Sequence, residues 1–178
     1  MPRLVWLDLE TTGLDENKDQ ILELVAATAD LRDPFNVTLV NSSVLWHHPS
    51  QVARHDQYVI DMHTKNGLWK ECANEEALDP FEVQDALLKS LPDTDDRDEK
   101  WILAGSTVHF DRGFLKTWMP KVVKLLHHRH LDVSSIKIDC ESQGMPKLPR
   151  AEAHRAWDDI QESMAHLKLC REWQQSKR

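Results

Sequence analysis

The amino-terminal part of the chain alternates short apolar runs with turn signals. Residues 3–9 predict a buried strand that ends in a carboxylate, and Thr11-Thr12-Gly13 marks a turn after it. Residues 20–31 and 36–46 predict two further strands, with Asp33-Pro34 as the turn between them. Together these runs predict a meander of three antiparallel strands.

The rest of the chain mixes helical spacing with short apolar runs. Residues 50–75 are expected to be irregular to helical. After them we expect a helix over 79–91, a strand over 101–105, helices over 110–118 and 120–127, a strand over 131–133 and a long helix over 154–174. Asp79-Pro80 is a typical helix start, and Ser134 is expected to cap a helix after the last strand. This order predicts an α/β fold with mixed strand direction.

Composition narrows the class of protein. The 178 residues suit one domain spanning 1–178, with an apolar share of 40% that is normal for globular proteins. We expect no membrane partner, because the chain shows no long apolar run and no secretory signal. Three scattered cysteines without a CxxC pair favour the cytoplasm. The net charge of −8 argues against coating long nucleic acid but allows a short nucleic-acid ligand.

Asp8 and Glu10 stand two residues apart at the end of the first predicted strand. Side chains at this spacing share a face of a strand, so the two carboxylates are expected to lie together. Burying both would be costly and would raise the pKa of each, whereas a hard divalent cation such as Mg²⁺ removes both penalties. The alternative is a solvated strand end, which the apolar run before the pair and the Thr-Thr-Gly after it disfavour.

Two further signals lie downstream. Asp111 follows the predicted strand 101–105, where open α/β sheets place ligands, although a carboxylate at a helix N-terminus would give the same pattern. In the spacing His154-x4-Asp159, a helix does not align the two side chains. We therefore expect His154 just before the last helix and Asp159 on its second turn. Asp158 should point away from Asp159 by about 100°.

Taken together, these motifs resemble the DEDDh family of 3′–5′ exonucleases, and the resemblance to its oligoribonuclease branch spans nearly the whole chain. The matching segments are residues 6–14 (WLDLETTGL), 104–115 (AGSTVHFDRGFL), 131–135 (LDVSS) and 153–160 (AHRAWDDI). The resemblance implies an RNase H-like fold with a mixed five-stranded sheet flanked by helices. It also implies a homodimer that degrades short single-stranded RNAs, down to dinucleotides, from the 3′ end to nucleoside 5′-monophosphates.

The resemblance also implies a catalytic set. Asp8, Glu10, Asp111 and Asp159 would hold two Mg²⁺ or Mn²⁺ ions, with His154 as the general base. Two such ions stabilise the attacking and leaving oxygens when a phosphodiester is hydrolysed. An imidazole, with an ordinary pKa of about 6.5, can accept the proton of the attacking water near neutral pH.

Side chains that contact the bases are implied as well. Leu14 and Tyr58 match the leucine and the aromatic residue that wedge the bases apart in the family, and His63 matches a substrate-side histidine. The aromatic residue of the family is usually tryptophan, and a methionine usually stands where this chain has Thr11. These departures put a strict preference for dinucleotides in doubt.

A phosphate cap is implied at the closed end of the pocket. Thr107, Arg129 and Ser134 match the family's capping residues, and arginine with hydroxyls suits charge-assisted bonds to phosphate. Ser106-Thr107 replaces the Asn-Ser pair of the family. His128 stands where the dimer partner contributes a tyrosine to the cap.

Two alternatives stay open beside an exoribonuclease for short oligomers. The first is a DEDDh exonuclease that acts on longer single-stranded RNA or DNA, as a proofreading subunit does, and the charge of −8 without a basic tail disfavours it. The second is a catalytically inactive nucleic-acid-binding module, which the intact catalytic positions disfavour.

Overall fold

A mixed sheet forms the centre of the structure, a computed structural model that describes residues 3–94, 96, 99–149 and 154–177. Its five strands lie in the order β3-β2-β1-β4-β5. They span Arg3–Thr11 (β1), Ile21–Asp30 (β2), Asp33–Val44 (β3), Trp101–Gly105 (β4) and Leu126–Asp132 (β5). The first three strands pair antiparallel, whereas β4 runs parallel to β1 and β5 parallel to β4. The expected meander and mixed sheet are confirmed.

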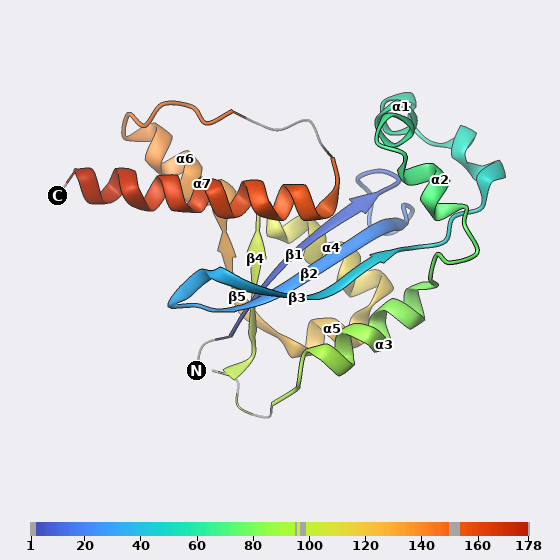
Figure 1. Cartoon of the computed structure of the whole chain (residues 1–178), viewed down its shortest axis with the longest axis horizontal. Helices are drawn as coiled ribbons and strands as arrows, with labels where there is room; N and C mark the ends of the chain where they lie inside the picture. The colour runs from blue at the N-terminus through green and yellow to red at the C-terminus, as the bar shows by residue number, and fades with distance from the viewer. Residues whose placement is uncertain (1–2, 95, 97–98, 150–153, 178) are drawn as a thin grey trace.

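Helices cover both faces of this sheet (Figure 1). The helices of the described residues are η1 Pro49–Arg54, α1 Gln57–Lys65, α2 Leu68–Cys72, α3 Pro80–Ser90, α4 Val108–Trp118, α5 Pro120–Leu125, α6 Val133–Ser142 and α7 Ala156–Ser176. The long α7 and α6 pack on one face, and α3, α4 and α5 pack on the other. Among the described residues, no helix is long and apolar enough to cross a bilayer.

Alternation along β1 decides which side chains face each helical layer. Leu7 and Leu9 belong to the core under α3, α4 and α5. Trp6 belongs to the opposite core, where α7 packs. Successive side chains of a strand point to opposite faces, so Asp8 and Glu10 continue the row of Trp6 and face the α7 side. The polar end of the strand therefore lies under the start of that helix.

The turn expected at Asp33-Pro34 is wrong. The β3 strand already begins at Asp33, and the chain reverses at residues 31–32. Proline is tolerated there because β3 is an edge strand, where a missing N–H need not break the ladder. The Pro34 carbonyl instead accepts a hydrogen bond from the Trp6 indole N–H at 2.8 Å.

The strand expected at 131–133 is also misplaced. The β5 strand begins at Leu126, directly after α5 ends at Leu125. The helix expected over 120–127 is therefore two residues too long. The polar residues of β5 conceal its strand pattern, since an edge strand need not bury both faces. Asp132 caps α6 in place of Ser134: its carboxylate accepts the N–H groups of Ser134 and Ser135 at 2.9 and 3.3 Å.

Gly105→Ala is expected to destabilise the protein by about 1–3 kcal/mol through overpacking. The added Cβ would lie 2.9 Å from the carbonyl oxygen of Leu7, a backbone atom held within the sheet. Gly113→Ala is the matched control, because the atoms nearest its added Cβ belong to the flexible side chain of Glu16, at 3.4 Å or more. Removing a glycine from the interior of α4 should stabilise by about 0.5–1 kcal/mol. Urea unfolding measures both, and effects of the same sign would contradict this packing.

Candidate active site

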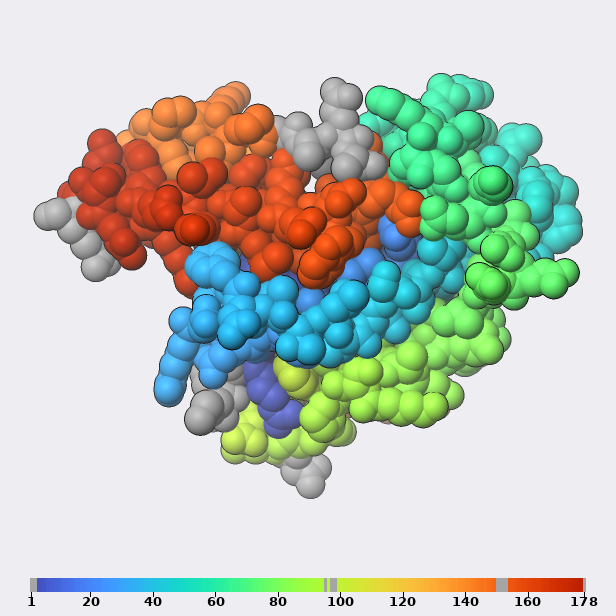
Figure 2. Space-filling model, in the orientation of Figure 1, coloured from blue at the N-terminus to red at the C-terminus, as the bar shows by residue number. Residues whose placement is uncertain are grey.

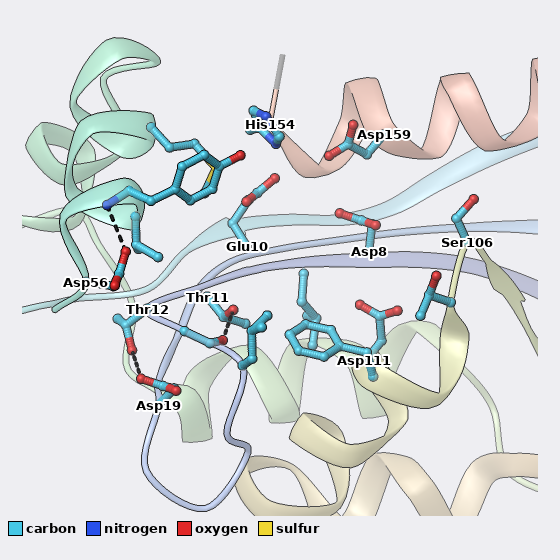
Figure 3. A pocket seen from close by; sticks show the side chains of 18 of the residues that line it. Asp8, Glu10, Thr11, Thr12, Asp19, Asp56, Ser106, Asp111, His154 and Asp159 are labelled. Atoms are coloured by element: carbon cyan, nitrogen blue, oxygen red, sulfur yellow. Dashed lines mark hydrogen bonds between the residues drawn. The ribbon is translucent and has the colours of Figure 1, made fainter. Parts of the chain in front are cut away.

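Three carboxylates converge where β1 ends. Asp8 and Glu10 project from β1 toward α7, and Asp159 projects back from that helix (Figure 3). One oxygen of each carboxylate lies within 4.8 Å of the others. Because α7 begins at Ala156, Asp159 belongs to its first turn and not to the second turn expected from the sequence. Its neighbour Asp158 is exposed.

Asp111 on α4 adds a fourth, buried carboxylate beside Asp8 (Figure 3). Burial raises the pKa of Asp8 well above its usual range, and the charges of Asp111, Asp159 and Glu10 raise it further. Burial, followed by the charges of Asp159 and Glu23, raises the pKa of Glu10 to about 8. Burial likewise raises the pKa of Asp111 to about 8. Positive charge is needed for all of them to ionise near neutral pH.

The chemistry of this cluster fits a hard divalent cation. Its donors are carboxylate oxygens, the ligands that Mg²⁺ and Mn²⁺ prefer. A cation would also relieve the mutual repulsion that raises the pKa values of Asp8 and Glu10. Asp8, Glu10, Asp111 and Asp159 are the residues that could hold such ions.

His154 lies just before α7, as its spacing predicts, and lines the same cavity as the carboxylates. In Figure 3 its imidazole stands near Glu10, across from β1. Its φ of 46° is left-handed, a conformation that residues other than glycine seldom adopt. The carbonyl of His154 accepts a hydrogen bond from the Asn66 side chain at 2.6 Å. An imidazole thus stands close to the carboxylates.

The cavity encloses about 870 Å³, within the range of small-molecule sites. Leu14 and Tyr58 line it with highly exposed side chains, at 83% and 66% of their full accessible area. Thr107 and Ser134 also line it, and their hydroxyl oxygens lie 3.1 Å apart. The structure therefore brings apolar and hydroxyl groups named from the sequence into one space with the carboxylates.

Three other residues named from the sequence do not line this cavity in the described part of the single chain. His63 is fully buried, and its Nε2–H donates to the carbonyl of Thr11 at 3.1 Å. Burial lowers the pKa of His63. His128 and Arg129 are exposed on the edge strand β5.

Sequence reasoning missed several residues that line the cavity. Lys137 follows Ser134 by one helical turn on α6, and Glu162, Ser163 and His166 lie on α7. The signal was present in the spacing. Residues three, four and seven positions after Asp159 share its helical face, so a helix over 154–174 already turns them toward the carboxylates.

Comparisons with known proteins agree on one family. The family described as Exonuclease matches residues 5–167. An oligoribonuclease of Corynebacterium diphtheriae is 35% identical over 171 residues, covering 93% of this chain and 80% of that protein. The human "Oligoribonuclease, mitochondrial" is 34% identical over 178 residues, covering 95% of this chain and 72% of that protein. The chain belongs to the oligoribonuclease branch of the exonuclease family. It is therefore a nuclease.

Solved structures of exonucleases share the fold. Exonuclease I of E. coli, solved with a dT13 oligonucleotide, aligns with a TM-score of 0.66 at 13% identity, covering 95% of this chain and 41% of that protein. Pop2p of S. pombe, in a Mg²⁺- and Mn²⁺-bound form, aligns with a TM-score of 0.60 at 16% identity, covering 92% of this chain and 81% of that one. The expected RNase H-like exonuclease fold is confirmed.

The metal-free protein is expected to lose stability as the pH rises through about 8. The pKa values of Glu10 and Asp111 are about 8 in the fold, whereas carboxyls of an unfolded chain have pKa values of about 4. The folded state therefore holds more protons between these limits, and deprotonation favours unfolding. The melting temperature in chelator should fall by several degrees between about pH 6.5 and about pH 8.5.

This pH window also avoids an opposing effect. Burial lowers the pKa of His63, and it lowers that of His47 to about 4. Such histidines make the folded state more stable as the pH rises toward about 6.5, the pKa of histidine in an unfolded chain. Above that pH their contribution changes little. Glu10→Gln is the control and should flatten the fall in melting temperature. A melting temperature that rises across the window would contradict the buried carboxylate cluster.

Proposed function

We propose that the protein is a 3′–5′ exoribonuclease that degrades short single-stranded RNA oligomers, down to dinucleotides, to nucleoside 5′-monophosphates. The observation that carries the proposal is the convergence of Asp8, Glu10 and Asp159 within 4.8 Å in a cavity that His154 also lines. The names of the curated relatives support the choice of short RNA as the substrate. The cavity of about 870 Å³ is of a size to take a small oligomer.

Catalysis is proposed to need two divalent ions, Mg²⁺ or Mn²⁺, held by Asp8, Glu10, Asp111 and Asp159. When bound, the ions supply charge stabilisation for the attacking and leaving oxygens of the phosphodiester. His154 accepts the proton of the attacking water as general base.

The rest of the cavity is proposed to orient the substrate. Leu14 and Tyr58 flank the bases, while Thr107 and Ser134 donate hydrogen bonds to the far phosphate. Lys137 also lines the cavity, one turn beyond Ser134, and adds a positive charge there.

A homodimer is proposed to complete the phosphate cap. His128 and Arg129 are exposed on the edge strand β5, where a second copy of the chain can reach them. His63, fully buried beside Thr11, is proposed to act indirectly by holding the strand end that precedes Leu14. The whole chain, residues 1–178, is proposed to act as one exonuclease domain in the cytoplasm.

Asp159→Asn is expected to lower kcat by more than about 10²-fold, because a ligand shared in the metal site is lost. Asp158→Asn is the matched control on the same helical turn, and its exposed side chain predicts a change within about 2-fold. Isothermal calorimetry with Mn²⁺ should show weaker binding only for Asp159→Asn. Full activity of Asp159→Asn would remove it from the metal site.

Substrate length tests the capped pocket. A strand longer than the cavity leaves the phosphate cap unsatisfied, at about 1.5–3 kcal/mol for each lost charged contact. Dinucleotides should therefore have a kcat/KM at least about 10-fold above that of heptanucleotides. Arg129→Ala and Lys137→Ala should each slow the dinucleotide more than the heptanucleotide if they contact the phosphate. Equal kcat/KM for both lengths in the wild type would favour an exonuclease for longer strands.

A further inference from the structure

The guanidinium of Arg155, the residue after His154, joins three separate elements. Its Nε and Nη2 donate to the carboxylate of Glu23 on β2, with distances of 2.8–3.2 Å. Its Nη1 and Nη2 also donate to the carboxylate of Glu71 on α2, at 3.0 and 2.8 Å. Paired, forked bonds of this kind fix orientation as well as distance. The chain at the start of α7 is therefore tied to β2 and to α2.

Glu23 fixes the helix start a second time. Its Oε2 accepts the backbone N–H of Ala156, the first residue of α7, at 3.0 Å. Glu23 is only 5% exposed and lies directly opposite Glu10 in the β1–β2 register. A buried carboxylate with this many donors has little freedom to move. The start of α7 is thus bound to Glu23, the residue paired with the active-site carboxylate Glu10 in the sheet.

Asn66 holds the other side of the same segment. Its Nδ2 donates to the carbonyl of His154 at 2.6 Å, while its Oδ1 accepts the N–H of Leu68 at 3.1 Å, which orients the amide. The space-filling view shows the start of α7, in orange, against the green segment that contains these residues (Figure 2). A left-handed φ such as that of His154 persists only where surrounding contacts impose it.

We propose that Arg155, Glu71 and Asn66 are positioning residues that form a clamp. The clamp holds His154 in its left-handed conformation and keeps its imidazole in the cavity with the carboxylates, where it can accept the proton of the attacking water. The inference rests on the proposed function, in which His154 is the general base. The contacts of the clamp lie at His154 and directly after it: Asn66 binds the His154 carbonyl, and Glu23 and Glu71 bind the side chain of the next residue, Arg155. Displacement of a catalytic group by about 1 Å can cost about 10²-fold in rate, so loosening these contacts should slow the chemistry.

The clamp can be tested with variants that leave the protein folded. The Glu71 side chain is 46% exposed, so Glu71→Ala leaves no buried charge. Arg155→Lys retains a positive charge for buried Glu23 but loses the fork. Glu76→Ala removes an exposed carboxylate from the loop that follows α2, and it is the matched control for Glu71→Ala.

The first measurements are kcat, KM, Mn²⁺ affinity and melting temperature with a dinucleotide substrate. Arg155→Lys should lower kcat by about 10–100-fold and Glu71→Ala by less, with KM and Mn²⁺ affinity near wild type. Glu76→Ala should match the wild type in every readout. Wild-type kcat for both Arg155→Lys and Glu71→Ala would overturn the clamp, as would a loss of Mn²⁺ affinity that parallels the loss of rate.

A double-mutant cycle then separates this inference from the proposed function. His154→Gly is the background, because glycine adopts a left-handed φ without strain. If the clamp acts through His154, adding Arg155→Lys to His154→Gly should cost at most about 2-fold more in kcat. A full multiplicative loss in that background would mean that Arg155 acts elsewhere and would overturn the clamp. Wild-type kcat for His154→Gly alone would instead defeat the general-base role.

Discussion

The crowding of carboxylates in a partly buried site is the constraint on which the rest of the site depends. Asp8, Glu10, Asp111 and Asp159 come from β1, α4 and α7. Burial raises the pKa of the first three, and the charges of neighbouring carboxylates in the cluster raise those of Asp8 and Glu10 further. Such a cluster costs stability unless protons or cations neutralise it. The fold meets this cost with two extensive apolar cores, one on each face of the sheet. A divalent cation held by these carboxylates would offset that cost, which supports the proposed metal site.

The two helical layers contribute different residues to the site. The α4 side supplies Asp111, while the α7 side supplies Asp159 and the approach that carries His154. Glu23 stands at the centre of these arrangements, because it faces Glu10 in the sheet and binds both Arg155 and the first N–H of α7. The sheet therefore helps to set the position of the helix start.

Local patterns were enough to predict the strand pair Asp8 and Glu10 and the place of His154 before a helix, because each depends on neighbours in sequence. The same patterns failed at β5, where polar residues hide an edge strand, and at Pro34, which the edge of the sheet tolerates. They could not find the Arg155–Glu23 contact, which joins residues 132 positions apart. Contacts of that kind depend on the topology of the fold, and no local pattern in a single sequence indicates them.

The alternation along β1 also limits how the chain can change in evolution. Trp6 in one core, Leu7 in the other and the carboxylates Asp8 and Glu10 share one continuous strand. An insertion or deletion of one residue between Trp6 and Asp8 would turn both carboxylates away from α7 and into an apolar layer. A change of length in this part of β1 is therefore expected to abolish the site, whereas the loops around the sheet can vary without moving the carboxylates.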